Sequence, residues 1–336
     1  MSDAKIFIPG SLVVPHLKRI VKESATDMVF GNRFLDEALG CIFKHDFVLV
    51  GAETGAGKTQ FSTNLALANA ALGKRVVFFA LEAEEHEIQS RLMYQTLAGF
   101  YFNDPHNQKG ETVTYTRYKK GKLGHVFEPY LEAAESILAA QLENIFPYYP
   151  PREEEFTAES LESTMIDCLG SKMDLVIIDH AHYFDYDADK ENKALKTIAK
   201  TVRKMTLRYG LPVVLVAHLR KTDRRFRELA PGVEEFHGSS DLTKIATRVV
   251  TLGRGGPSKQ FPGCFETFIR IGKNRYEGST TAYVSKVFFD PRVNDYRKEL
   301  VLGRLADMGR EFVAVDRDDL PLWAKPLVNK ETVTVP

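Results

Sequence analysis

The sequence predicts an α/β fold, in which a mostly parallel, twisted sheet carries helices on both faces and gains antiparallel strands towards the C-terminus. From Phe47 onward, short apolar runs alternate with amphipathic stretches, as strands alternate with crossover helices in a parallel sheet. The apolar runs are nearly continuous, which indicates that both faces of the sheet are covered. After about Thr247 the runs are separated only by short turns, which is typical of hairpins.

Eight strands are expected from these runs. The first five, which we expect to be parallel, are Phe47–Val50, Arg75–Ala80, Ile145–Tyr149, Leu175–Ile178 and Pro212–Val216. The last three, expected in hairpins, are Val249–Leu252, Thr267–Ile271 and Thr281–Phe289.

The chain of 336 residues divides into three parts, and its 44% hydrophobic content suffices for one large core. Residues 1–30 are expected to form an N-terminal arm, in which Leu12–Lys22 has helical spacing. This helix either docks as an arm on the domain or on a neighbouring subunit, or is a surface helix of the same domain. Residues 31–300 hold the main domain. Residues 301–336 contain several acids, Pro321 and Pro326, which predicts a loosely packed tail.

Composition narrows the function classes only in part. Lys and Arg total 45, as do Asp and Glu, so any affinity for nucleic acid must come from a local cluster or from a ring that concentrates one. Cys41, Cys168 and Cys264 form no CxxC pair, which argues against a zinc site or a disulfide framework and favours a reducing cytoplasm. No apolar run approaches the length of a membrane span, so we expect a soluble protein without a membrane partner.

The strongest motif is an apolar strand from Phe47 that runs into a glycine-rich turn and then into a helix over Gln60–Leu72. Its spacing is that of a P-loop in which an alanine takes the place of the first glycine. Backbone N–H groups of such a loop point at phosphate oxygens, a lysine bridges the β- and γ-phosphates, and a hydroxyl binds Mg²⁺. ATP and Mg²⁺ are therefore the predicted cofactors. The residues expected to contact the nucleotide are Ala52, Glu53, Thr54, Gly55, Ala56, Gly57, Lys58, Thr59 and Gln60.

Asp179 is the expected second ligand of the metal, beside Thr59. It follows a fully apolar strand and so lies at the carboxyl edge of the sheet, where α/β folds bind ligands. His180 and His182 come directly after it. A pair of histidines at this spacing is more often incidental, and no third metal ligand is evident.

Glu82 ends the strand that starts at Arg75 and is positioned to polarise the attacking water. Glu84 and Glu85 compete for this role. Acids are common in the first turn of a helix, which is the better explanation for both.

Further segments, taken in order with the P-loop, resemble the ATPase domain of the DnaB-type replicative hexameric helicases, within the wider RecA/KaiC superfamily. The resemblance covers roughly residues 30–290 and implies the RecA-like P-loop NTPase form of the α/β fold. It also implies a homo-oligomeric ring, commonly a hexamer. The segments are Asn32–Gly40, Phe79–Glu82, Leu175–Asp179, Leu211–His218, His237–Asp241, and Lys273–Arg275 with Gly278.

The resemblance assigns roles to four residues. It implies that Glu82 is the catalytic base, that His218 senses the γ-phosphate, and that Lys273 and Arg275 reach into the ATP site of the next subunit. From the residues alone, a solvated hairpin tip is the preferred interpretation of Lys273 and Arg275. His218 stands where these helicases usually carry glutamine, although imidazole can still donate to phosphate. About thirty residues precede the domain, so a loader or primase is expected as a separate partner.

A cluster of cations lies on an expected loop after His218. In a ring this loop would face the central channel and follow the backbone of single-stranded DNA. A charge run of this kind is as often only solvated surface. The expected DNA-binding residues are Arg220, Lys221, Arg224, Arg225 and Arg227, together with Gly238, Ser239 and Ser240 from the segment that resembles a DNA-proximal loop.

The predicted function is that of an ATP-dependent, ring-forming motor on single-stranded DNA, a DnaB-type replicative DNA helicase. A RecA/RadA-like recombinase or mediator ATPase is one alternative. A KaiC-like regulatory ATPase without DNA translocation is the other. All three share the same phosphate chemistry, so the sequence separates them poorly.

Overall fold

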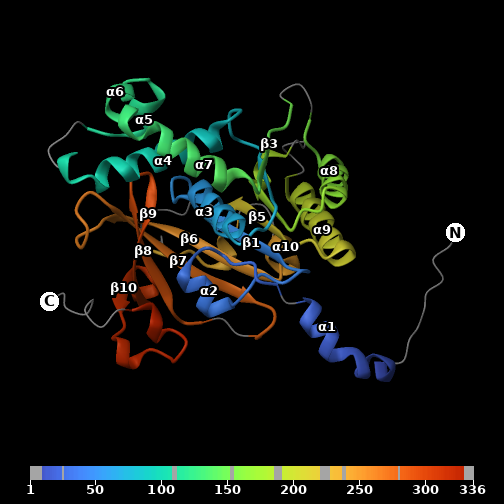
Figure 1. The fold of residues 1–336 in the computed structure, drawn as a ribbon. Helices are drawn as coiled ribbons and strands as arrows, with labels where there is room; N and C mark the ends of the chain where they lie inside the picture. Colours follow the sequence, from blue (N-terminus) through green and yellow to red (C-terminus); the bar gives the residue numbers. More distant parts are fainter. Residues whose placement is uncertain are drawn as a thin grey trace.

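The structure is a computed structural model that describes residues 10–24, 26–107, 112–151, 155–184, 191–219, 228–236, 240–278 and 281–328. In this part of the chain ten strands form one sheet in the order β10-β9-β8-β7-β6-β1-β5-β4-β2-β3 (Figure 1). The strands are β1 (Phe47–Ala52), β2 (Val76–Ala80), β3 (Ile145–Tyr148), β4 (Leu175–Asp179), β5 (Val213–His218), β6 (Arg248–Pro257), β7 (Phe265–Asn274), β8 (Val284–Asp290), β9 (Asp295–Ala306) and β10 (Glu311–Ala314).

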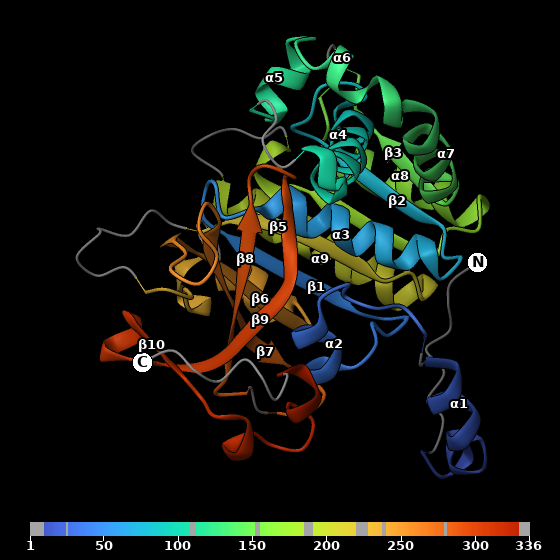
Figure 2. The ribbon, with the colours of Figure 1, turned by 60° about the vertical axis from the view of Figure 1, so that its left-hand side comes forward.

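The sheet changes from parallel to antiparallel beyond β6. β1 is parallel to both β5 and β6, and β4, β2 and β3 continue the parallel part. From β7 to β10 each strand is antiparallel to its neighbour (Figure 2). This confirms the predicted sheet, and β9 and β10 extend it beyond the eight expected strands. β6 was expected in a hairpin and does pair antiparallel with β7, but it also pairs with β1 in parallel register, with Val48 opposite Arg248.

Helices cover both faces of the sheet, and the strands alternate between the two cores. Val48 and Val50 of β1 point into one core, whereas Phe47 and Leu49 point into the other. The first core lies under α2 (Arg33–Leu39) and α3 (Lys58–Ala71), and the second under α8 (Ala158–Gly170), α9 (Glu191–Tyr209) and α10 (Ser240–Ile245).

A further helical layer is inserted between β2 and β3. It lies at the top of Figure 1 and has its own buried cluster, in which Tyr94, Leu97 and Phe127 take part. The sequence patterns did not predict this layer. Its helices are α4 (Glu87–Asn103), α5 (Tyr115–Lys119), α6 (Gly124–Phe127) and α7 (Leu131–Leu142).

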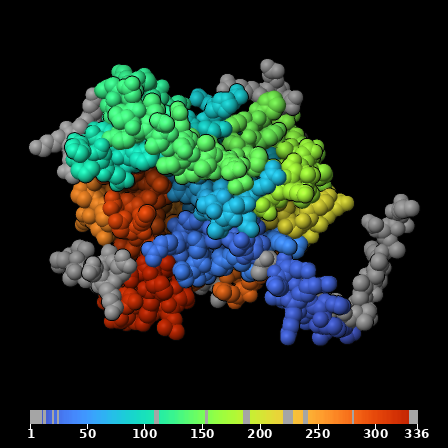
Figure 3. All heavy atoms as spheres, in the orientation of Figure 1, coloured from blue at the N-terminus to red at the C-terminus, as the bar shows by residue number. Residues whose placement is uncertain are grey.

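The expected N-terminal arm is helical and projects from the body. A 3-10 turn over Gly10–His16 leads into α1 (Leu17–Ser24), which stands apart from the domain in Figures 1 and 3. Farther along, Met28 and Phe30 are buried in the core, so residues 26–30 already belong to the domain. None of the helices in the described ranges has the length and apolar character that a membrane crossing needs.

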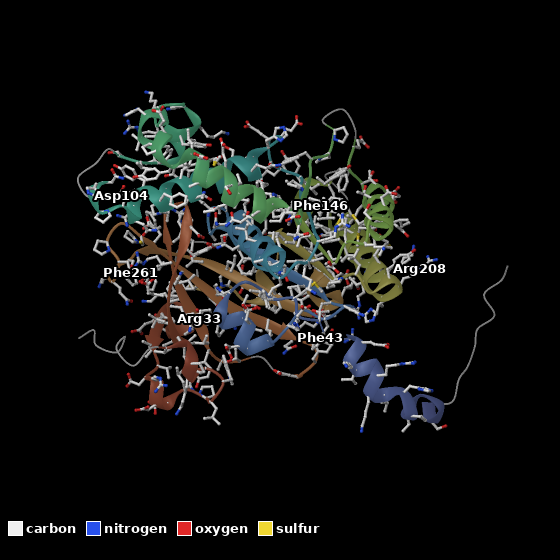
Figure 4. The ribbon with its side chains drawn as sticks, in the orientation of Figure 1. Arg33, Phe43, Asp104, Phe146, Arg208 and Phe261 are labelled. Carbon is white, nitrogen blue, oxygen red and sulfur yellow. The ribbon has the colours of Figure 1, made fainter. Side chains whose placement is uncertain are left out.

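The loosely packed tail expected from residue 301 is wrong for the described part of this segment. β9 runs across residue 300, β10 pairs with it, and Leu320, Leu327 and Val328 are buried in the core beside α2. Arg33 of α2, labelled in Figure 4, donates a hydrogen bond to the carbonyl of Pro326 at 3.1 Å. The physical reason is that a few well-spaced apolar residues anchor this acidic, proline-containing segment over an apolar face.

Candidate nucleotide-binding site

The P-loop lies where the sequence places it, between the end of β1 and the start of α3. Gly55 and Gly57 have positive φ values of 78° and 89°, which the left-handed turn requires. Gly57 also packs closely, because a Cβ there would lie 2.2 Å from the Tyr296 hydroxyl. No acidic residue occupies the first turn of α3. Its unpaired N–H groups and the helix dipole therefore favour an anion at this end.

The P-loop borders a pocket of about 410 Å³. Residues 54–60 line it, and so do Glu82 and His218, two of the expected site residues. Ala52 and Glu53 are not among the lining residues, and Ala52 is fully buried at the end of β1. The nucleotide contacts expected of these two are therefore not supported by the pocket. Ala52 is still paired with β5 in the sheet, and Glu53 is the residue after the strand.

Asp179 is hydrogen-bonded to Thr59, one of the residues that line the pocket, but does not line the pocket itself. Asp179 is 6% exposed, and it accepts a hydrogen bond from the Thr59 hydroxyl. Burial raises the pKa of Asp179 to about 6, while the hydrogen bond from Thr59 and the charge of Lys58 act against this rise. Burial also lowers the pKa of Lys58. A carboxylate and a hydroxyl beside a phosphate-binding loop are the oxygen donors that Mg²⁺ takes, so the residues present fit MgATP.

A chain of side chains connects Lys58 with Glu82 through two histidines. Lys58 Nζ lies 2.9 Å from Nδ1 of His218, whose Nε2 lies 3.1 Å from Nε2 of His180. His180 Nε2 is in turn 2.9 Å from Glu82 Oε2. Burial, followed by the charge of Lys58, lowers the pKa of His180 to about 4, which leaves this imidazole neutral near pH 7.

In the sequence, His180 was considered only as a possible metal ligand, and the structure gives it hydrogen bonds to Glu82 and His218 that the sequence did not predict. β4 and β5 are neighbours, so the residue after Asp179 faces the end of β5, where His218 lies. His182 joins the group, and its Nδ1 accepts a hydrogen bond from the His218 N–H at 3.3 Å. The strand order is what brings these histidines together, and the sequence alone does not give that order. In the described part of the chain no cluster of three or more His, Cys, Asp or Glu side chains is arranged to hold a metal ion.

Glu82 is better placed than its two competitors. Its side chain is 61% exposed and lines the P-loop pocket. Glu84 instead pairs with Lys119 at 3.1 Å, and Glu85 lies 3.5 Å from a histidine, His86. Both line only the adjacent cavity of about 970 Å³. The geometry therefore favours Glu82 as the group that faces the nucleotide.

Two arginines of the pocket, and a tyrosine that contacts the P-loop, were not expected from the sequence. Arg91 comes from α4 and Arg254 from β6, and both line the pocket. The Tyr296 hydroxyl of β9 donates to the carbonyl of Ala56 in the P-loop at 3.2 Å. No local motif marks these residues, because tertiary folding alone brings them to the loop.

Arg275 and Lys273 lie at the opposite end of β1 from the P-loop. The Arg275 N–H donates to the carbonyl of Thr247 at 2.9 Å, just before β6, and its side chain is exposed. The Lys273 side chain differs from that of Arg275, because its ammonium group is bound within the same chain. Its ammonium donates to the carbonyls of Thr243, Lys244 and Ala246, at 2.8, 2.9 and 2.8 Å, at the end of α10.

Most of the expected DNA-binding residues lie outside the described residues. Ser240 begins α10, but its side chain is also outside the described part. The others are Arg220, Lys221, Arg224, Arg225, Arg227, Gly238 and Ser239.

Two curated proteins are similar to this chain in sequence. Two curated relatives named "Probable plasmid replicative DNA helicase", from Chlamydia trachomatis serovar L2 and from Chlamydia trachomatis, are 23% identical over 295 residues. The alignment covers 83% of this chain but only 59% of each relative. The chain thus matches less than two thirds of the length of these relatives.

Two solved structures share the fold at low sequence identity. "The Structure Of A DnaB-Like Replicative Helicase And Its Interactions With Primase" matches with a TM-score of 0.66 at 16% identity, covering 88% of this chain and 68% of that one. "ATPase Domain of G40P" matches with a TM-score of 0.66 at 17% identity, covering 86% and 99%. The family model described as DnaB-like helicase C terminal domain matches residues 28–298, which is most of the chain. The chain therefore belongs to the DnaB-like helicase C-terminal domain family.

Proposed function

We propose that this chain is an ATP hydrolase that assembles into a homo-oligomeric ring, with six copies expected, and moves along single-stranded DNA as a replicative DNA helicase. Family membership supports the proposal, as do the curated relatives named plasmid replicative DNA helicase. One solved relative is described with its primase interactions, so a primase or a loader is the partner that we expect. We expect the activity in the cytoplasm.

One observation supports the proposed ring. The P-loop follows the last residue of β1, whereas Arg275 lies beside Thr247, level with the first residue of β1. The six residues of β1 separate the two by roughly 16 Å, at about 3.3 Å per residue. A chain with this geometry cannot bring Arg275 to its own nucleotide. In a head-to-tail ring, the same edge faces the P-loop of the next copy.

The side chains around the P-loop have separate tasks in this proposal. Lys58, Thr59 and Asp179 would hold MgATP, in which the metal neutralises charge on the phosphates. Glu82 orients the attacking water and accepts its proton. His218 donates to the γ-phosphate. The neighbour's Arg275 stabilises charge that develops on the transferred phosphoryl group.

Contact with DNA is assigned to the cations of residues 220–227 and to residues 238–240. The first group follows β5, which ends at His218 beside the nucleotide pocket, and the second leads into α10. Cations repeated around a ring would follow the phosphate backbone without any need for a net positive charge.

Unwinding of a forked duplex tests the proposal. The wild-type protein with MgATP is expected to release the strand of a fork, and Lys58→Ala is expected to release none although its fold is intact. ATP-dependent filaments on single strands without unwinding would favour the recombinase. Hydrolysis that neither responds to DNA nor drives unwinding would favour the regulatory ATPase.

A further inference from the structure

A buried ion pair lies at the end of β1 that is remote from the P-loop. Asp46 and Arg248 are 0% and 1% exposed, and Arg248 Nη1 lies 3.3 Å from Asp46 Oδ2. The guanidinium is enclosed by the rings of Phe30, Phe43 and Tyr276, at 5.7, 4.9 and 5.0 Å from their centroids. Phe43 is labelled in Figure 4, at the end of the sheet towards α1. A pair this deeply buried is favourable only when additional hydrogen bonds complete it.

Tyr276 supplies one of these hydrogen bonds from the residue next to Arg275. Its hydroxyl donates to Asp46 Oδ1 at 2.8 Å, and its ring packs edge-on against Phe43 at 4.8 Å. About half of the Tyr276 side chain is exposed, so its apolar burial is incomplete and the hydroxyl is its specific attachment. Asp46 also accepts from the Thr247 hydroxyl at 2.7 Å. The hairpin that carries Arg275 is thus bonded directly to the start of β1.

A second attachment lies two residues before Arg275. The three hydrogen bonds from Lys273 to the last carbonyls of α10 hold the other side of the hairpin. Between Lys273 and Tyr276, the side chain of Arg275 remains exposed. The hairpin is therefore fixed on both sides of an exposed arginine.

We propose that Tyr276 is a positioning residue, which sets the direction of Arg275 towards the neighbouring subunit through its bond to the buried Asp46–Arg248 pair. Lys273 is the second attachment. This inference rests on the proposed function, in which Arg275 completes the neighbour's ATP site. Because β1 joins Asp46 to the P-loop, one strand carries both the nucleotide site of a subunit and the support of the arginine that it contributes.

The test is Tyr276→Phe, which keeps the ring and removes only the hydroxyl. We expect ATP hydrolysis by the assembled protein to fall about tenfold, which is the loss expected when one hydrogen bond to a charged group is removed. The Kd for ATP should be unchanged. Tyr130→Phe is the matched control, because its hydroxyl also donates to a carboxylate, Asp104 Oδ2 at 2.7 Å, but in the helical layer. Its hydrolysis rate should equal that of the wild type.

Mixing variants before assembly measures the recovery of ATP hydrolysis, which distinguishes a misplaced Arg275 from a general structural defect. Tyr276→Phe should regain hydrolysis with Lys58→Ala, whose subunits contribute an intact arginine hairpin, but gain nothing with Arg275→Ala. A wild-type rate for Tyr276→Phe, weakened ATP binding, or equal recovery with both partners would overturn the inference. Failure of Lys58→Ala and Arg275→Ala to restore each other would instead overturn the proposed function, so the two failures are distinguishable.

Discussion

Gly57 is the P-loop position with the least room for a side chain, and its replacement has a cost that can be worked out. Its φ of +89° lies in the left-handed region, and a Cβ there would lie 2.2 Å from Tyr296 Oη and 3.2 Å from Cζ. A left-handed backbone costs an alanine about 1–2 kcal/mol. Forcing a methyl group into a filled site costs about 1–3 kcal/mol more. We therefore expect Gly57→Ala to lower the free energy of unfolding by about 2–5 kcal/mol.

Two matched variants separate the parts of this cost. Gly73→Ala also has a positive φ, +73°, but no atom within 4 Å of the new Cβ, so it should lose only about 1–2 kcal/mol. Adding Tyr296→Phe to Gly57→Ala removes the nearest oxygen and should recover part of the loss. Urea unfolding followed by circular dichroism measures all of these changes. Equal losses at Gly57 and Gly73, without recovery from Tyr296→Phe, would refute the close packing of Tyr296 on the P-loop.

Three further predictions address catalysis, pH and the C-terminal segment. Glu82→Gln should bind ATP with unchanged affinity in calorimetry but hydrolyse it at least about 100-fold more slowly; weakened binding would shift attention to Glu84 or Glu85. Burial raises the pKa of Asp36 to about 6. The contribution of Asp36 to the free energy of unfolding is therefore fully present below about pH 4 and is lost as the pH rises through about 6. Relative to Asp36→Asn, the wild type should lose about 1–3 kcal/mol of unfolding free energy over that range, and a constant difference would contradict this. Leu327→Ala should lower the free energy of unfolding by about 2–5 kcal/mol, since Leu327 is 4% exposed. A loss under about 1 kcal/mol would instead support a loosely packed C-terminal tail.

Local sequence patterns were sufficient for most of the parallel part of the sheet and for the P-loop. Buried parallel strands need continuous apolar residues, so β1, β2, β4 and β5 were each visible as a run. The P-loop and the acid at the end of β4 were visible because both belong to one stretch of chain with fixed spacing.

The remaining features depend on contacts between distant segments. His180 and His218 meet only because β4 and β5 are neighbours. Tyr296 reaches the P-loop only because the start of β9 lies beside α3, where Asp295 accepts hydrogen bonds from Gln60 and Asn64. The C-terminal segment was misjudged because its acids and prolines conceal a few apolar residues, including Leu320 and Leu327, that fill the core beside α2. Composition indicates how polar a segment is, but not where its apolar residues dock.

The central claim is that the ATP site is completed by a second copy of the chain, and mixing two inactive variants tests it most directly. Lys58→Ala keeps Arg275, and Arg275→Ala keeps Lys58, so random co-assembly pairs an intact P-loop with an intact arginine at some interfaces. At equal amounts this holds for about a quarter of the interfaces in a head-to-tail ring. We predict that hydrolysis returns to about that fraction of the wild-type rate and falls when either variant is in excess. No recovery at any ratio, with mixed assemblies shown to form, would contradict the account.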